Sequence, residues 1–375
     1  MMRGVFNVII KEIIVYKVKM EMKNPFKTSY GTTKDRTFLI LEAIDENGIS
    51  GWGECVTSDE PLYLEEFTNA AQLMLEEHLI PIVTGANIQH PDEISELFRP
   101  FKRNNLAKSA IDGAVWDLYA KRENKSLSAC LGGTRSEIEV GVSLGIEENI
   151  KDLLTIIEQR VNEGYKRIKV KIQPNQDIEV IRSIRKAYPN LPLMADANAA
   201  YTLDDLDKLQ KLDPFNLMMI EQPLRAGDLI DHATLQKNIT TPVCLDESIT
   251  SYEDTRQAME IGSCKIINLK ISRVGGLSES KRIHNLCVKN DIPLWCGGML
   301  EAGIGRAHNI AISSLANFSL PGDTAASSKY WYKDIIQPEV TVEKGMLKVP
   351  DTPGIGYTVN RQALEAVTTE KKVFS

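Results

Sequence analysis

The chain has 375 residues, of which 43% are hydrophobic and 25% charged, a composition that excludes an intrinsically disordered protein. The net charge of −7 argues against nucleic acid or an anionic membrane as the main partner. At about 150 residues per domain, the length predicts two domains, or one large barrel with an attached domain.

The amino-terminal stretch MMRGVFNVIIKEIIVYK is apolar, but Lys11 and Glu12 interrupt it. No run approaches the roughly 20 apolar residues that span a bilayer, and no small-residue cleavage site follows, so we interpret the stretch as a first β-strand. The six cysteines form no C-x-x-C pair, and most lie in apolar runs. These features predict reduced thiols and a cytoplasmic protein.

The first 130 residues predict an α+β domain. Long strands are expected at about 8–20, 36–45 and 49–55, with a hairpin turn at 47–48. Helical periodicity follows at about 63–79, 91–101 and 106–122.

From about residue 138 onward, short apolar runs alternate with helical stretches. The runs cover 138–144, 167–173, 191–196, 217–221, 241–246, 264–270, 292–297 and 317–320. Continuous apolar runs are typical of parallel strands buried on both faces. Eight such strands predict an α/β fold of the (β/α)8-type barrel class. A doubly wound open sheet is the alternative, which the even spacing disfavours.

We therefore predict three parts: a capping domain at 1–130, a barrel that carries the active site at 131–330, and a carboxy-terminal segment at 331–375. The last segment holds strand-like pieces such as EVTVEKGMLKVP. We expect it to return to the capping domain and complete it. The chain has no long linker, so we expect the domains to be tightly docked.

Charged residues end five consecutive strands of the predicted barrel. They are Lys171, Asp196, Glu221, Asp246 and Lys270, at intervals of 25, 25, 25 and 24 residues. A single Asp after a strand is usually a helix N-cap, but that explanation does not cover five strands in succession. In a barrel this spacing brings all five to the carboxyl-terminal rim, where such barrels hold their active sites.

Three converging carboxylates repel one another unless a cation lies between them. Oxygen donors without a nearby histidine or cysteine favour Mg²⁺, or Mn²⁺, over zinc. Lys169 and Lys171 point the same way on one strand, and each charge disfavours the other, so that a neutral amine is available as a base. Such a site suits the removal of a proton next to a carboxylate, with the metal stabilising the enediolate.

The sequence resembles the muconate-lactonizing subgroup of the enolase superfamily, for which a Lys or His base with Mg²⁺ is known. This resemblance rests on K-x-K at 169–171, DANAAY at 196–201, EQP at 221–223, LDES at 245–248 and NLKISRVGG at 268–276. The stretches 110–133 and 295–323 are similar to the branch that holds o-succinylbenzoate synthases and N-acylamino acid racemases.

The resemblance implies roles for the rim residues. Asp196, Glu221 and Asp246 match the metal ligands, with Mg²⁺ or Mn²⁺ as the cofactor. Lys171 matches the acid/base, and Lys270 matches the lysine that faces the substrate from the opposite side.

Further residues are expected to support these. Lys169 would tune or orient Lys171. Arg273 would tune Lys270 through its charge, and capping of the following loop is its alternative role. Asn198 and Glu301 are expected beside the site as hydrogen-bonding supports. The alternative for Asn198 is a turn residue, and the alternative for Glu301 is an ordinary salt bridge. Glu247 is expected behind the metal ligands or directed elsewhere.

Two loops of the capping domain, 20–34 and 54–63, are candidates for contacting a hydrophobic substrate body. The first contains glycine and is expected to close as a lid, with an ordinary hairpin loop as the alternative.

The resemblance implies a metal-dependent lyase that dehydrates a cyclohexadiene carboxylate bearing hydroxyl and succinyl groups. A racemase of N-acylamino acids is the second reading, while dipeptide epimerases and cycloisomerases fit 295–323 less well. A scaffold protein without activity is disfavoured by the five intact rim residues. We expect a small-molecule carboxylate as the partner, no nucleic acid and no membrane, and a homo-oligomer.

Overall fold

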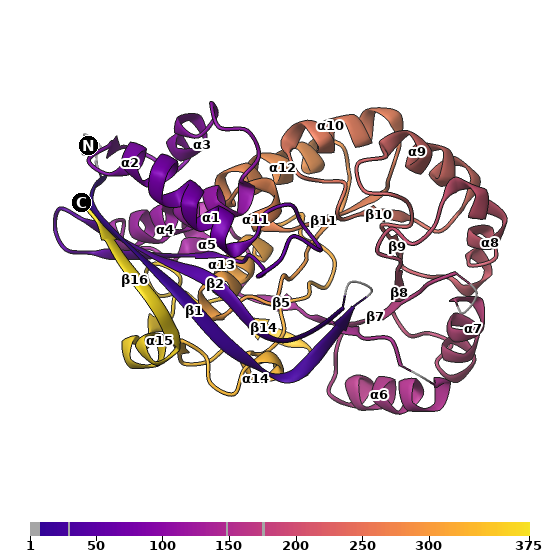
Figure 1. Ribbon diagram of the computed structural model, residues 1–375. Helices are drawn as coiled ribbons and strands as arrows, with labels where there is room; N and C mark the ends of the chain where they lie inside the picture. Colours follow the sequence, from indigo (N-terminus) through magenta and orange to yellow (C-terminus); the bar gives the residue numbers. More distant parts are fainter. Residues whose placement is uncertain (1–7, 29–30, 148, 175–176) are drawn as a thin grey trace.

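The computed structural model describes residues 8–28, 31–147, 149–174 and 177–375 (Figure 1). Its amino-terminal part is built on one antiparallel sheet, in the strand order β16-β1-β2-β3. The strands are β1 (Val8–Thr28), β2 (Gly31–Asp45), β3 (Ser50–Cys55) and, from the other end of the chain, β16 (Thr368–Phe374). The short β4 (Asn87–Ile88) also pairs with β1.

Helices follow in the capping domain. They are α1 (Thr68–Met74), the π-helical turn η1 (Leu75–Leu79), α2 (Ile80–Val83), α3 (Glu93–Leu97), α4 (Asn105–Arg122) and α5 (Leu127–Leu131). All of them except α5 contribute to the hydrophobic core on this sheet, whereas α5 packs against α4 and the later helix α13 (Gly303–Ser313). The central helix α4 lies so close to β3 that a Cβ atom at Gly53 would stand 1.8 Å from the carbonyl oxygen of Ala110. Only glycine permits this approach.

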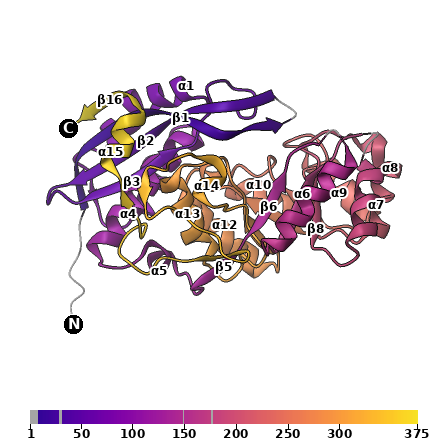
Figure 2. The same cartoon turned by 90° about the horizontal axis from the view of Figure 1, so that it is seen from below.

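The segment 20–34 has the form of the alternative named above, an ordinary hairpin. Strands β1 and β2 continue through it and pair as far as Thr28 and Gly31, so it is a β-hairpin, of which residues 29–30 lie outside the described residues. Figures 1 and 2 both show this hairpin extending from the sheet toward the barrel. The predicted helix at 63–79 begins only at Thr68 and continues to Val83.

The second part is a parallel sheet of seven strands in the order β12-β11-β10-β9-β8-β7-β6, curled into a barrel. The strands are β6 (Gly141–Leu144), β7 (Arg167–Lys171), β8 (Leu193–Asp196), β9 (Ile220–Glu221), β10 (Val243–Leu245), β11 (Ile266–Leu269) and β12 (Leu294–Cys296).

The eighth predicted strand, 317–320, is not a strand in the structure. The irregular segment 317–323 takes its place between β12 and β6. The amide of Leu320 donates to the carbonyl of Leu294 over 3.3 Å, and the amide of Gly141 donates to the carbonyl of Gly322 over 2.8 Å. The barrel is therefore closed by hydrogen bonds from irregular backbone, and Pro321 within the segment disfavours a regular strand there.

Helices cover the outside of the barrel (Figure 1). They are α6 (Ile150–Asn162), α7 (Asp177–Ala187), η2 (Leu203–Asp205), α8 (Leu206–Gln210), η3 (Asp213–Phe215), α9 (Leu229–Asn238), α10 (Tyr252–Ile261), α11 (Ile271–Val274), α12 (Leu277–Lys289) and α13 (Gly303–Ser313).

The carboxy-terminal segment packs on both parts of the molecule. It holds α14 (Ser327–Tyr330), β13 (Ile336–Gln337), β14 (Met346–Lys348), β15 (Thr358–Val359) and α15 (Arg361–Val367), and ends in β16. The expectation that this segment returns to the capping domain holds for α15 and β16. Part of EVTVEKGMLKVP does not return to it, because β14 pairs with β5 (Glu137–Glu139), which directly precedes the barrel strand β6.

Carboxylates of the capping domain bind the amino-terminal ends of two barrel helices. Glu54 of β3 accepts hydrogen bonds from the amides of Ala302 and Gly305, over 2.8 and 2.7 Å, at the start of α13. Asp112 of α4 accepts one from the amide of Leu277, over 2.6 Å, at the start of α12. Free amides and the helix dipole favour a carboxylate at these positions, so the two domains are fastened together by polar contacts.

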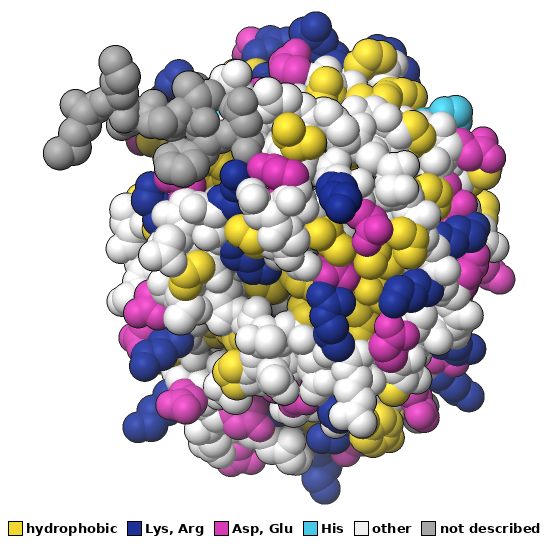
Figure 3. All heavy atoms as spheres, turned by 90° about the vertical axis from the view of Figure 1, so that its left-hand side faces the viewer, with side chains coloured by type: hydrophobic (Ala, Val, Ile, Leu, Met, Phe, Trp, Pro, Cys, Tyr) yellow, Lys and Arg dark blue, Asp and Glu magenta, His cyan; other side chains and the backbone are white. Residues whose placement is uncertain are grey.

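Acidic and basic side chains are interspersed over the capping-domain face (Figure 3). Within the described ranges, none of the helices has both the length and the apolar character needed to cross a bilayer.

His308 of α13 lies buried at the domain interface, where a Cβ atom at Gly113 would stand 2.7 Å from its ring. Burial lowers the pKa of His308 to about 4, below the value of about 6.5 for an exposed histidine. Between these values the unfolded chain binds a proton that the folded chain excludes, so this group lowers stability as the pH falls.

We expect His308→Gln to make folding less sensitive to acid. The wild type is expected to lose about 2–3 kcal/mol more than this variant between pH 7 and pH 4.5. Urea unfolding of both proteins at the two pH values measures the difference, and equal losses would show that His308 does not contribute.

Candidate active site

The five charged residues predicted at the strand ends come together at one rim of the barrel. Lys171, Asp196 and Glu221 are the last residues of β7, β8 and β9, and they are direct neighbours in the register of the sheet. Asp246 follows β10, and Lys270 follows β11. Parallel strands end at the same edge of the sheet, so the regular spacing in sequence becomes a cluster in space.

Lys171 is held on one side of this cluster. Its Nζ donates hydrogen bonds to Asp196 Oδ2 over 2.6 Å and to Asn198 Oδ1 over 2.5 Å. Asn198 also donates from its Nδ2 to Glu247 Oε1 over 3.1 Å. Asn198 therefore links the rim lysine to Glu247.

Lys169 lies deeper in the barrel, where its Nζ stands 2.7 Å from Asp323 Oδ2, 3.2 Å from Glu221 Oε2 and 4.9 Å from the centre of the Trp295 ring. Burial alone lowers the pKa of Lys169, but the surrounding carboxylates, Asp323 first, raise it well above its usual value. The expectation that the paired lysines lower each other's pKa does not hold for Lys169, because Asp323, Glu221 and Asp196, which Lys171 also contacts, outweigh any such effect.

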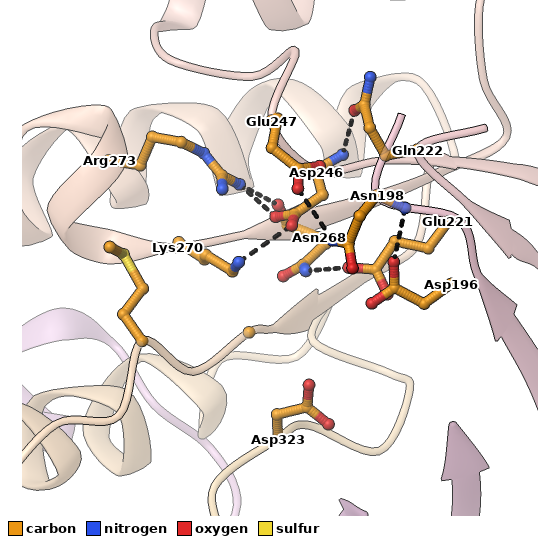
Figure 4. Close-up of polar contacts among 12 residues, drawn as sticks. Asp196, Asn198, Glu221, Gln222, Asp246, Glu247, Asn268, Lys270, Arg273 and Asp323 are labelled. Carbon is orange, nitrogen blue, oxygen red and sulfur yellow. Dashed lines mark hydrogen bonds and ion pairs between the residues drawn. The ribbon is translucent and has the colours of Figure 1, made fainter. Parts of the chain in front are cut away.

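Lys270 lies across the barrel from Lys171. In one direction around the barrel β8, β9 and β10 separate β7 from β11, and in the other direction β6, the irregular segment 317–323 and β12 separate them. Lys270 Nζ donates to Asp246 Oδ2 over 2.9 Å and to the Tyr63 hydroxyl over 2.8 Å. Arg273 binds the other oxygen of the same carboxylate, with Nη2 2.5 Å from Asp246 Oδ1. Figure 4 shows both cations converging on Asp246. Arg273 and Lys270 thus bind the two oxygens of one carboxylate.

The buried carboxyl groups lie close together, and their pKa values shift in opposite directions. Burial, with the charges of Asp196 and Asp246, raises the pKa of Glu221 to about 8. Burial also favours the protonated form of Asp246, but Arg273 and Lys270 outweigh it and hold the pKa of this carboxyl well below its usual range.

Two further glutamates, Glu247 and Glu301, lie close to the cluster. Glu247 turns toward the cluster: its Oε2 is buried without a hydrogen-bond partner, and burial with the charge of Asp246 raises its pKa to about 7. Glu301 Oε1 accepts a hydrogen bond from the amide of Met299 over 2.8 Å. Glu301 therefore shapes the loop that follows β12.

Four residues that contact the rim cluster were not singled out from the sequence. Asn268 donates to Glu221 Oε1 over 2.7 Å, and Gln222 Oε1 accepts from the amide of Asp246 over 3.0 Å. Both belong to the motifs quoted above, and Asn268 lies two residues before Lys270, so strand alternation would have found it. Asp323 lies apart from the other labelled carboxylates (Figure 4). It stands on the irregular closing segment, at the end of the stretch 295–323, and Tyr63 ends the candidate substrate loop 54–63, but no strand periodicity singled out either residue.

A cavity of about 500 Å³ opens above these residues, within the range of small-molecule sites. Both predicted substrate loops contribute to its walls, 20–34 through Thr33 and Lys34 and 54–63 through residues 58–60, 62 and 63; the neighbouring Asp35 and Arg36 also line it. The barrel supplies Ser143, the rim lysines and acids, and residues 298–301, and the carboxy-terminal segment supplies Tyr330.

The donor chemistry of the cluster fits a hard divalent cation. Its acceptors are carboxylate and amide oxygens, and two of them, Glu247 Oε2 and Asn268 Oδ1, are buried without a partner. In the described part of the chain, however, no three Asp, Glu, His or Cys side chains are arranged as a set of metal ligands. Lysine and arginine nitrogens contact the oxygens of Asp196 and Asp246 instead.

Two family models match the chain: the mandelate racemase / muconate lactonizing enzyme N-terminal domain over residues 10–132, and the enolase C-terminal domain-like family over residues 152–363. An o-succinylbenzoate synthase of Geobacillus kaustophilus is 56% identical over 97% of both chains. An N-succinylamino acid racemase of Thermus thermophilus is 43% identical over 96% of this chain and 97% of that protein.

Solved structures agree with these matches. A member of the enolase superfamily from Listeria innocua superposes with a TM-score of 0.96, at 44% identity, over 98% of this chain and 99% of that one. A dipeptide epimerase of Cytophaga hutchinsonii, complexed with Mg and a dipeptide, gives 0.86 at 26% identity over 98% and 100% of the two chains. The chain therefore belongs to the enolase superfamily, in its muconate-lactonizing subgroup.

Proposed function

We propose that this chain is a hydro-lyase of the o-succinylbenzoate synthase type. It would dehydrate a succinyl-hydroxycyclohexadiene carboxylate to 2-succinylbenzoate, a step of menaquinone biosynthesis. The observation that carries this proposal is the pair Lys171 and Lys270, which face each other across a cavity with carboxylates between them. The identity of 56% to a synthase over nearly the whole chain supports the choice of substrate.

We assign Asp196, Glu221 and Asp246 as the residues that hold a divalent cation, Mg²⁺ or Mn²⁺. When bound, the cation supplies positive charge to the substrate carboxylate, and this makes the neighbouring carbon more acidic.

Lys171 takes the proton from the carbon next to the carboxylate. Asp196 and Asn198, which contact its Nζ at 2.6 and 2.5 Å, fix the direction from which the amine approaches. The same ammonium then returns the proton to the departing hydroxyl on that face of the ring. One C–H and one C–O bond break, a C=C bond forms, and water leaves.

Lys270 acts on the opposite face as a fixed positive charge. Its contacts with Asp246 and the Tyr63 hydroxyl, at 2.9 and 2.8 Å, hold the ammonium at the cavity wall. A charge placed before the reaction stabilises the negative charge that develops on the substrate at little cost in reorganisation.

The test is conversion of the cyclohexadiene substrate to 2-succinylbenzoate by the purified protein with Mg²⁺. We expect kcat/KM above about 10⁴ M⁻¹s⁻¹, as for an enzyme acting on its own substrate. Absence of product, with intact fold and metal, would refute the proposal.

We propose racemisation of N-succinylamino acids as a second activity of the same site. A racemase must remove a proton from one face and deliver one to the other, and Lys171 and Lys270 reach the cavity from opposite sides. The identity of 43% to an N-succinylamino acid racemase favours this candidate over other proton transfers.

Arg273 is expected to matter more for racemisation than for dehydration. It occupies one oxygen of Asp246 and leaves the other to Lys270, so its loss would let Lys270 bind both oxygens and withdraw from the substrate. In dehydration Lys270 serves only as a charge. Arg273→Met should therefore lower the rate of racemisation by at least about tenfold more than the rate of dehydration. Equal losses in both assays would show that Arg273 is merely structural.

A further inference from the structure

Arg36 of β2 is a buried arginine whose guanidinium binds main-chain carbonyls of two separate loops. Its Nη1 donates to the carbonyl of Met299 and, over 3.3 Å, to that of Leu300. Its Nη2 donates to the carbonyls of Val56 and Thr57, over 3.1 and 2.5 Å. Only 5% of Arg36 is exposed, and no carboxylate of the described residues forms an ion pair with it.

This arrangement is costly for a structure to keep. Burial lowers the pKa of Arg36, although the charges of Glu301, Glu54 and Asp59 oppose that effect. Leu300, one of the bonded residues, has a backbone φ of +61°, a left-handed conformation that leucine rarely adopts. A strained residue of this kind persists only where its surroundings hold it, and the guanidinium of Arg36 contributes to holding it.

The three segments that meet at Arg36 are three walls of the cavity. Residues 33–36 carry the arginine, residues 58–63 directly follow the carbonyls of Val56 and Thr57, and residues 298–301 contain the carbonyls of Met299 and Leu300. The middle segment ends at Tyr63, whose hydroxyl accepts the hydrogen bond of Lys270. A planar fork with donors on both sides spans two turns at once, which an ammonium group does not.

We propose that Arg36 is a positioning residue: it fastens the loops of the capping domain to the barrel loop 298–301 and so fixes the upper walls of the substrate cavity. This inference rests on the proposed function for its kinetic consequence. Its structural consequence, the ordering of the three segments, is independent of the substrate.

The test compares Arg36→Met and Arg36→Lys with wild type in two measurements. The first is kcat and KM for dehydration, where we expect both variants to raise KM by about tenfold or more, with a smaller change in kcat, because the reacting groups stay in the barrel. The second is hydrogen–deuterium exchange of the amides, which should become faster in 57–63 and 298–301 and stay unchanged in β7 to β11.

Arg185→Met is the matched control, because Arg185 of α7 also donates to main-chain carbonyls, those of Phe215, Tyr188, Pro189, Leu191 and Asn216. It does not line the cavity. We expect it to lower stability while KM stays within about twofold of wild type.

Several outcomes would overturn the proposal. They are an unchanged KM and unchanged exchange in Arg36→Met, full rescue by Arg36→Lys, or the same kinetic change in Arg185→Met. If Arg36→Met does not fold, Arg36→Lys decides the question, since it keeps the charge and loses only the fork. If wild type dehydrates nothing, the proposed function fails, and the exchange measurement alone still confirms or refutes the role of Arg36.

Discussion

Replacing Lys171 with alanine is expected to lower the rate of dehydration by about 10⁴-fold or more. A general base contributes about 10²–10⁴-fold in typical enzymes, and the carbon acid here is weak. No second amine can take over on that face, because Lys169 is engaged by Asp323 and Glu221 and Lys270 approaches from the other side. Steady-state kcat at saturating substrate measures the loss.

Two further measurements make this result specific. Calorimetric titration of Lys171→Ala with Mg²⁺ should show that the metal still binds, so that the loss belongs to the base. Lys151→Ala, at an exposed position in α6, should keep the wild-type rate. A Lys171→Ala enzyme that retains more than about a tenth of the wild-type rate would show that another residue is the base.

Asp246→Asn is expected to weaken Mg²⁺ binding by more than about 10²-fold, since losing even a supporting group of a metal ligand costs 10–100-fold. The substitution keeps the shape of the side chain and removes its negative charge. Lys270 and Arg273 also contact this carboxylate. Activity should fall with metal affinity, while the fold survives because Gln222 still binds the main chain at this position. Calorimetry and the dehydration assay measure the two losses.

Asp207→Asn, on the exposed side of α8, is the matched control and should leave both quantities unchanged. Exhaustive treatment of the wild type with EDTA should abolish activity, and added Mg²⁺ should restore it. Full activity after chelation would contradict the assignment of a metal to these carboxylates.

The barrel could be predicted from the sequence because parallel strands buried on both faces leave continuous apolar runs. Seven of the eight runs form strands of the sheet. The eighth, 317–320, has the composition of a strand, but its neighbour Pro321 disfavours regular pairing. The pairing partner of β14 could not be predicted from the sequence. Its pairing with β5 joins residues about 200 positions apart, and strand propensity carries no information about such long-range contacts.

The candidate site was predictable to the extent that its residues lie on strands. Lys171, Asp196 and Glu221 share one edge because the strands are in register. Tyr63, Arg36 and Asp323 reach the site from another domain and from irregular backbone, so no periodicity announces them. The raised pKa of Lys169 could not be predicted, because its main partner, Asp323, lies more than 150 residues away in the chain.

Hydrogen exchange at the α-carbon tests most directly that Lys171 and Lys270 serve opposite faces of one cavity. Each enantiomer of an N-succinylamino acid is incubated in D₂O with wild type, Lys171→Ala and Lys270→Ala, and the α-proton signal is followed by NMR. We predict that wild type exchanges the proton of both enantiomers, that Lys171→Ala loses exchange of one enantiomer, and that Lys270→Ala loses exchange of the other. Loss of the same enantiomer in both variants, or exchange that survives in both, would contradict this account.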